Sequence, residues 1–97
     1  MILQFIRLRS KLPEAELLQK AKEREPRFRA IPGLLQKYYV KLEGEGNFGG
    51  VYVWDSAASM QAYKVSDLAK SIPEAYGVTE APAMEFMDIL FRLREAE

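Results

Sequence analysis

The sequence predicts one α+β domain, residues 1–97, whose elements follow the order βαββαβ and whose four strands form an antiparallel sheet. The chain of 97 residues has the length of a single small domain. Its apolar fraction of 48% is that of a globular protein rather than a disordered one. Short apolar runs with strand-like or helix-like spacing are separated by glycine and proline, which marks the boundaries between elements.

A strand and a helix are predicted in the first part of the chain. Residues 2–9 are rich in β-branched and aromatic side chains and end in alternation, which is typical of a strand. Pro13 suits the first turn of a helix, and apolar residues recur at helical spacing after it. Because Pro26 lacks an N–H and clashes with the preceding turn, we expect the helix to end near Glu25 and a short helical turn to follow.

A hairpin of two strands is predicted next, over residues 34–42 and 49–54. Between them, Gly44-Glu45-Gly46-Asn47 supplies residue types that tight turns need. The segment from Gly44 to Gly49 also matches the dinucleotide-binding pattern G-x-G-x-x-G. That pattern requires a helix after it, whose N-terminus meets the pyrophosphate. Strands on both sides therefore favour a hairpin turn.

A second helix and a fourth strand complete the order. Asp55 or Ser56 can cap the helix by accepting a bond from a free backbone N–H. We expect a break near Ser66, and Pro73 and Gly77 are expected to close the helical region. Residues 83–92 are predicted to form the last strand. This ferredoxin-like order places both helices on one face of the sheet.

The predicted strands are apolar on both faces. Residues 51–54 form an unbroken apolar run, and the last strand repeats the pattern. A sheet with one face in water would alternate between apolar and polar side chains. Because the helices cover one face, we expect a second copy of the sheet to cover the other, as a homodimeric α/β barrel. Each buried side chain of this kind contributes roughly 1.5–3 kcal/mol.

Composition narrows the classes of function. The chain has 14 lysines and arginines and 14 aspartates and glutamates, so its net charge is zero. Because binding to phosphates needs a basic surface, this balance argues against nucleic acid as the main partner. No apolar run reaches the roughly 18–20 residues of a membrane span, and the first residues lack the basic lead of a signal peptide. We therefore expect a cytoplasmic protein with no membrane partner. The chain has no cysteine or histidine, which removes thiolate zinc sites and the commonest metal ligand and general base.

Several short motifs, in their order and spacing, resemble a known family. They are Leu3-Gln4, Ile31-Pro32-Gly33-Leu34, Gly49-Gly50-Val51-Tyr52-Val53-Trp54-Asp55-Ser56 and Ala62-Tyr63. Together they resemble the dimeric α/β barrel superfamily of antibiotic-biosynthesis monooxygenases, and most closely the YdhR-type mono-oxygenases. The resemblance covers nearly the whole chain.

This resemblance implies a cofactor-independent monooxygenase that acts on a small aromatic or quinol-like compound. The substrate would lie in an apolar cavity between sheet and helices, lose a proton and reduce oxygen directly, so neither a metal nor another cofactor is expected. Trp54 matches a tryptophan that some relatives use at the end of the third strand. Relatives also place an asparagine four residues earlier, where this chain has Gly50, so that hydrogen-bond donor is missing.

Six residues are candidates for the ligand pocket, and no catalytic residue is assigned. They are Gln4, Lys37, Tyr39, Tyr52, Trp54 and Tyr63. The aromatic side chains could donate hydrogen bonds to a ligand from their polar tips or pack as ordinary core. Lys37, flanked by aromatic residues, could have a shifted pKa and act as a base, or could extend its ammonium to water. Gln4 is uncharged and is expected to face the cavity, whereas Arg7 is expected to pair with Glu85 or Asp88 across strands.

Two other functions remain open. The same pocket could serve a non-catalytic homodimer that binds or senses a small apolar or aromatic ligand. It could also serve an isomerase or decarboxylase of the same barrel family, in which a carboxylate or a lysine moves a proton.

Overall fold

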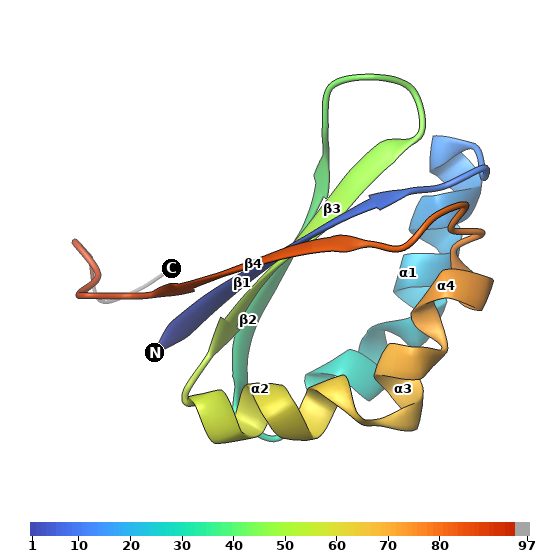
Figure 1. Ribbon diagram of the computed structural model, residues 1–97. Coiled ribbons are helices and arrows are strands. Elements are labelled where there is room, and N and C mark those ends of the chain that lie inside the picture. Colours follow the sequence, from blue (N-terminus) through green and yellow to red (C-terminus); the bar gives the residue numbers. More distant parts are fainter. Residues whose placement is uncertain (95–97) are drawn as a thin grey trace.

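Four strands form a single antiparallel sheet with the spatial order β2-β3-β1-β4. Figure 1 shows the computed structural model, in which residues 1–94 are described. The elements are β1 (Ile2–Arg9), α1 (Glu14–Arg29), β2 (Leu34–Lys41), β3 (Asn47–Trp54), α2 (Ala57–Lys64), α3 (Asp67–Lys70), α4 (Ile72–Ala75) and β4 (Ala83–Asp88). The predicted order and the ferredoxin-like α+β fold are confirmed, with the second helix divided into α2, α3 and α4.

All four helices lie on one side of the sheet, which we call the inner face (Figure 1). Inner-face side chains and the apolar faces of the helices form one core. Its buried members are Ile6, Leu17, Ala21, Phe28, Phe48, Tyr52, Trp54, Met60, Tyr63, Ile72 and Tyr76. On the opposite side, the outer face, no element of the described chain packs against the strands. Within residues 1–94, no helix combines the length and the apolar composition needed to cross a membrane.

Helix α1 continues through Pro26, so the predicted break there is wrong. The proline removes the bond that its N–H would donate to the carbonyl of Lys22, and both residues are exposed. The following turn is held in place by Phe28, which is only 3% exposed and packs against Tyr63 with 6.2 Å between ring centroids. Burial of the Phe28 ring, roughly 1.5–3 kcal/mol, offsets much of what the missing bond costs.

Serine caps divide the second helical region. The Ser56 hydroxyl accepts a bond from the N–H of Ser59 at 3.2 Å and caps α2. Ser66 caps α3 in the same way, which confirms the predicted break. Pro73 lies in the first turn of α4, where a missing N–H has no consequence, so Pro73 does not end the helical region as predicted. Helix α4 ends at Ala75 with Tyr76 as its C-cap, and Gly77 follows with a φ of 59°, so the predicted end at Gly77 is confirmed.

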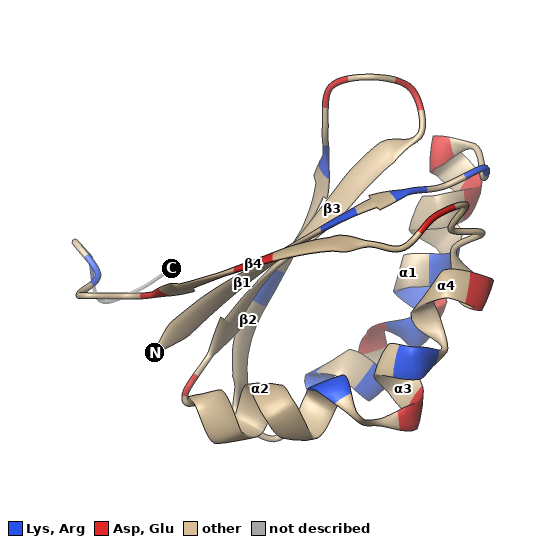
Figure 2. Cartoon of the chain, viewed as in Figure 1, with Lys and Arg blue, Asp and Glu red and all other residues tan. Residues whose placement is uncertain are grey.

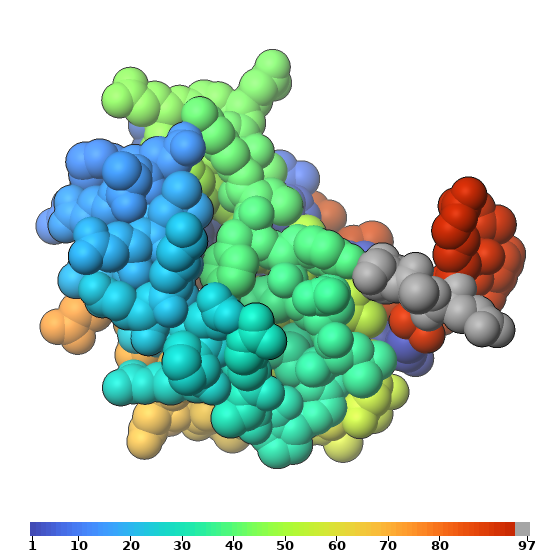
Figure 3. Space-filling model, turned by 180° about the vertical axis from the view of Figure 1, so that it is seen from behind, coloured from blue at the N-terminus to red at the C-terminus, as the bar shows by residue number. Residues whose placement is uncertain are grey.

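The hairpin between β2 and β3 is confirmed, and the prediction for β4 is too long. Gly44 and Gly46 have φ of 90° and 81°, so the glycine pattern serves a turn. Strand β4 ends at Asp88 because Asp88 pairs with Ile2, the first residue of β1. Ile89 still donates its N–H to the carbonyl of Met1 at 3.0 Å, and the residues after it project from the body of the domain (Figure 3).

Candidate functional site

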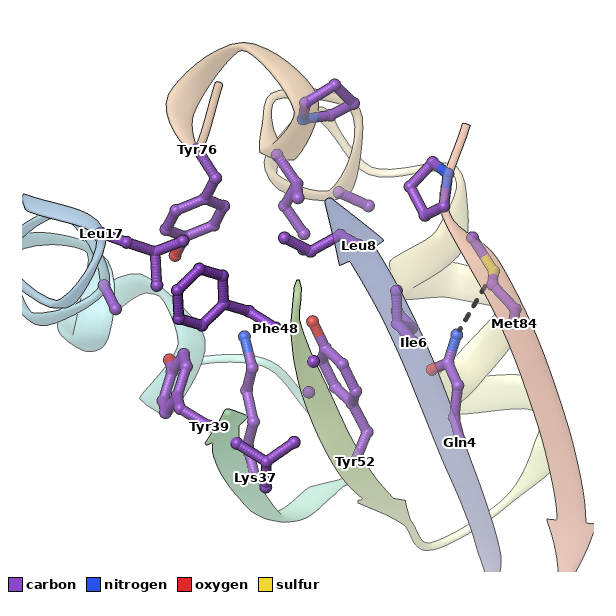
Figure 4. A pocket seen from close by; sticks show the side chains of 18 of the residues that line it. Gln4, Ile6, Leu8, Leu17, Lys37, Tyr39, Phe48, Tyr52, Tyr76 and Met84 are labelled. Carbon is purple, nitrogen blue, oxygen red and sulfur yellow. Dashed lines mark hydrogen bonds between the residues drawn. The ribbon is translucent and has the colours of Figure 1, made fainter. Parts of the chain in front are cut away.

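A cavity of about 300 Å³ lies between the inner face of the sheet and the helices (Figure 4). Most of its wall is apolar, formed by side chains from strands and helices. Among these are Ile6, Leu8, Leu17, Phe48, Ile72 and Met84. The volume is at the lower end of the range for ligand sites, so the cavity suits a small molecule.

A glycine on β3 helps to create this space. Gly50 faces the cavity and pairs with Ile6 of β1 and Tyr39 of β2. A Cβ atom at Gly50 would lie 3.1 Å from Cε1 of Tyr52 and 3.6 Å from Cε of Lys37. The missing side chain therefore leaves room for the Tyr52 ring and the Lys37 stem.

Lys37 extends from β2 into the cavity and lies between the rings of Tyr39 and Tyr52 (Figure 4). Its Nζ atom is 3.5 Å from the ring centroid of Phe28, 4.4 Å from that of Tyr39 and 4.6 Å from that of Tyr52. No carboxylate of the described chain forms an ion pair with it. Burial, assisted by the charge of Arg24, lowers the pKa of Lys37 to about 7. The ring faces attract the ammonium form and limit the decrease.

Tyrosine hydroxyls are the main neutral polar groups of the site. The hydroxyls of Tyr52 and Tyr63 are 3.3 Å apart and share a hydrogen bond. Burial raises the pKa of Tyr39 and of Tyr63 to about 12. Burial also raises the pKa of Tyr52 well above its usual value. These phenols therefore keep their protons at neutral pH and can donate hydrogen bonds.

Tyr76, which is not among the six candidates predicted from the sequence, also lines the cavity. Its hydroxyl is buried without a hydrogen bond of normal geometry among residues 1–94, and its interaction with Arg24 opposes part of the rise that burial causes in its pKa. Two contacts fix its position: the guanidinium of Arg24 lies 5.6 Å from its ring centroid, and the Ser10 hydroxyl donates to its carbonyl oxygen. Tyr76 lies just after the short helix α4, where no sequence periodicity indicates which way a side chain points.

Trp54 lies behind the cavity wall rather than in it. It is fully buried, and its ring stacks on Tyr52 with 6.0 Å between centroids and an interplanar angle of 4°. Its indole N–H donates to Oε1 of Gln4 at 2.9 Å. Gln4 itself lines the cavity, with its amide nitrogen 4.0 Å from Sδ of Met84. Trp54 thus supports Tyr52 and orients Gln4.

Five of the six candidates line one cavity: Gln4, Lys37, Tyr39, Tyr52 and Tyr63. Trp54 is the exception. Arg7 lies outside the site, where it pairs with Glu85 at 3.8 Å while both side chains stay more than half exposed. The predicted pairing with Glu85 is therefore found, whereas Asp88 lies opposite Ile2.

The charged residues around the cavity are mainly cationic. Figure 2 shows charged residues along α1, α3 and α4, while most of the sheet is uncharged. The lining includes Lys37, Lys41, Lys64 and Lys70, and its one carboxylate within the described chain is Glu14. Because Glu14 pairs with Lys41 at 2.8 Å, the remaining field favours an anion.

Comparison with known proteins shows the family and the fold. Residues 2–90 match the family described as "Putative mono-oxygenase ydhR". A protein of unknown function from Nitrosomonas europaea has a TM-score of 0.79 and 23% identity, with 99% of this chain and 95% of that chain covered. SnoaB, a cofactor-independent oxygenase from Streptomyces nogalater, has a TM-score of 0.76 and 11% identity, with 97% of each chain covered.

A structure of an antibiotic biosynthesis monooxygenase has a TM-score of 0.72 and 19% identity, with 93% of this chain and 99% of that chain covered. No curated protein sequence matches at a significant level. At these identities the solved structures show a shared fold. The match over residues 2–90 goes further: this chain belongs to the YdhR mono-oxygenase family.

Proposed function

We propose that this protein is a cofactor-independent monooxygenase that oxidises a small aromatic or quinol-like compound in the cavity between sheet and helices. The observation that carries the proposal is the apolar cavity of about 300 Å³ into which Lys37 and several tyrosines project. Membership of a mono-oxygenase family supports the reaction type. The shared fold with SnoaB, a cofactor-independent oxygenase, supports the absence of a cofactor.

The chemistry needs a substrate that is itself a reductant. An anthrone-like ring loses a proton from its methylene carbon, and the resulting anion transfers electrons to molecular oxygen. One oxygen atom forms a bond to that carbon and becomes a carbonyl, and the other leaves as water with the two hydrogens of the methylene group. The protein excludes water and offers neutral donors such as the Tyr39 and Tyr63 hydroxyls to the developing anion.

Oxygen uptake with a panel of hydroquinones and anthrones tests this proposal. Tyr38 and Tyr39 provide a matched pair, because neighbouring residues of a strand point to opposite faces and only Tyr39 lines the cavity. We expect Tyr39→Phe to lower kcat/KM about tenfold or more, as loss of a donor to a developing anion does. Tyr38→Phe should leave it unchanged. No uptake above buffer for any compound would overturn the proposal.

The second candidate function is non-catalytic binding of the same class of ligand. It is favoured by Gly50, which stands where some characterised oxygenases of the superfamily have an asparagine donor. Calorimetric binding of an anthrone analogue, together with no consumption of oxygen, would select this candidate.

We also propose that a second copy of this chain covers the outer face. Residues paired across the strands share a face, so the outer face carries Leu3, Phe5, Tyr38, Val51, Val53 and Met87. Apolar surface continues beyond the sheet in Leu90 and Phe91, which are 91% and 78% exposed. The same face bears both Arg7 and Glu85, and a patch of both signs can complement itself across a two-fold axis.

Sedimentation at low micromolar concentration tests this assembly. We expect a mass of two chains, and Val51→Lys, which adds a charge to the centre of the outer face, should shift it to one chain. A stable, folded single chain of the native sequence would contradict the proposed homodimer. Its location in the cytoplasm stays a prediction of the sequence.

A further inference from the structure

We propose that Lys37 is the group that accepts the proton from the bound substrate. We also propose that the substrate is an aromatic compound whose weakly acidic proton belongs to a phenol or an enol. The inference deepens the proposed function and rests on it for the redox step. Proton acceptance by Lys37 can nevertheless be tested without oxygen.

The arrangement of the cavity leaves few other bases. The chain has no histidine, and Glu14, the one carboxylate of the described lining, is engaged by Lys41. A hydrogen bond from Lys41 to Glu14 raises the pKa of Lys41, so this lysine keeps its proton. Lys64 and Lys70 are exposed, whereas Lys37 lies among three aromatic rings inside the cavity.

The titratable and charged groups that act on Lys37 or on the tyrosines beside it come from several elements around the cavity. They are Arg24 and Glu25 on α1, Tyr39 on β2, Tyr52 on β3, Tyr63 on α2 and Tyr76 after α4. Arg24 disfavours a second cation, and burial has a larger effect in the same direction, so the pKa of Lys37 falls to about 7. A substantial fraction of the protein therefore has a neutral amine at neutral pH, while the four tyrosines remain protonated.

The step is a simple proton transfer. The O–H or C–H bond of the substrate breaks, an N–H bond forms on Lys37, and an ammonium beside an organic anion results. The three ring faces then hold the ammonium, and the cationic field of Arg24 and the tyrosine hydroxyls stabilise the anion. The cage of rings thus accommodates the neutral amine before the transfer and the ammonium after it.

Binding of 2-naphthol under nitrogen at pH 8 tests the step, because the naphtholate absorbs at longer wavelength than naphthol. A phenol of this type has a pKa of about 10 in water, so the free ligand is neutral at this pH. We expect the native protein to bind part of it as naphtholate, because attraction between the ammonium and the naphtholate inside the cavity offsets the difference between a pKa of about 7 for Lys37 and about 10 for the ligand. Lys37→Met should bind it as neutral naphthol, with at least a tenfold loss of the bound anion, and the exposed Lys22→Met is the control that should behave as native. Persistence of the naphtholate band in Lys37→Met would overturn the inference.

A second measurement keeps the test independent of the variant's folding. In the native protein, the pH dependence of Lys37 acetylation, followed by mass spectrometry, should have its midpoint near 7, well below the value of about 10.4 for a lysine in a model peptide. A midpoint equal to that of the model peptide would contradict the inference. If naphthol ionises beside Lys37 but no compound consumes oxygen, the proposed oxygenase function fails while the role of Lys37 as a proton acceptor stands.

Discussion

Both faces of the sheet are mainly apolar, yet they differ in the polar groups that they carry and in how deeply those groups are buried. On the inner face, Gln4, Lys37 and the tyrosine hydroxyls are set among apolar side chains around a cavity. On the outer face, polar groups such as Arg7 and Glu85 stay more than half exposed. Buried polar groups with unusual pKa values are typical of ligand sites, which is why we propose a ligand for the inner face. A mainly apolar surface whose charged groups stay in solvent is typical of a protein interface, which is why we propose a second copy for the outer face.

The largest expected change in the free energy of unfolding comes from a substitution on the inner face. Trp54→Ala removes the most buried side chain of the sheet and should lower the free energy of unfolding by about 3–5 kcal/mol. Urea denaturation followed by circular dichroism measures this loss, which should not depend on protein concentration. Tyr38→Ala on the outer face is the contrast: its effect should grow with concentration, because pairing of chains contributes to stability by mass action. A concentration-dependent loss for Trp54→Ala would reverse the comparison.

The next largest effect is an increase in stability, and it comes from replacing Lys37. The unfolded chain keeps the Lys37 proton up to the usual pKa of 10.5, whereas the folded chain releases it near 7. Between these values the unfolded state binds more protons, so stability rises with pH. Lys37→Met removes this penalty and should stabilise the fold by an amount on the order of a few kcal/mol below pH 7. The gain should vanish above pH 10.5, and denaturation curves across this range measure it. A gain independent of pH would indicate packing rather than charge.

A smaller loss of stability is expected from replacing Gln4, a polar residue that lines the cavity. Gln4→Leu leaves the buried indole N–H of Trp54 without its acceptor, which costs about 1–3 kcal/mol. Gln4→Glu keeps an acceptor at the same place and is the matched control for this bond. Thermal denaturation near pH 7, combined with the indole N–H resonance in NMR spectra, distinguishes a lost bond from lost packing.

The smallest effect should come from the outer face. In the single chain, whose outer face is uncovered, Glu85→Gln breaks an exposed ion pair with Arg7 and should change the free energy of unfolding by less than about 0.5 kcal/mol. Added salt should abolish even this difference, because the pair is screened by the solvent. A loss above about 1 kcal/mol, measured by urea denaturation at low concentration, would show that this pair is less exposed in solution.

Much of the fold follows from local patterns in the sequence. The strands, the glycine-rich hairpin and the Ser66 break each depend on residues close together in the chain. The continuation of α1 through Pro26 does not, because it depends on the packing of Phe28 against a distant tyrosine. The end of β4 depends likewise on where its neighbour β1 begins.

The sequence predicts which face of the sheet carries the site, but it does not predict how deeply each side chain is buried. Alternation along a strand shows that Lys37 and Tyr39 share one face, and both line the cavity. It cannot show that Trp54 lies behind the wall, since depth depends on how closely the helices approach each part of the sheet. Tyr76 was missed because a short helix and a loop set its direction.

The bond between Ser10 and Tyr76 joins residues 66 positions apart in the chain. Closing so long a loop is slow and costs entropy, so the wall that carries Tyr76 should be completed late in folding. A chain emerging from the ribosome would have no pocket until nearly all of it had been made. A molecule that binds in this cavity would therefore stabilise only the finished domain, and would not guide the earlier steps of folding.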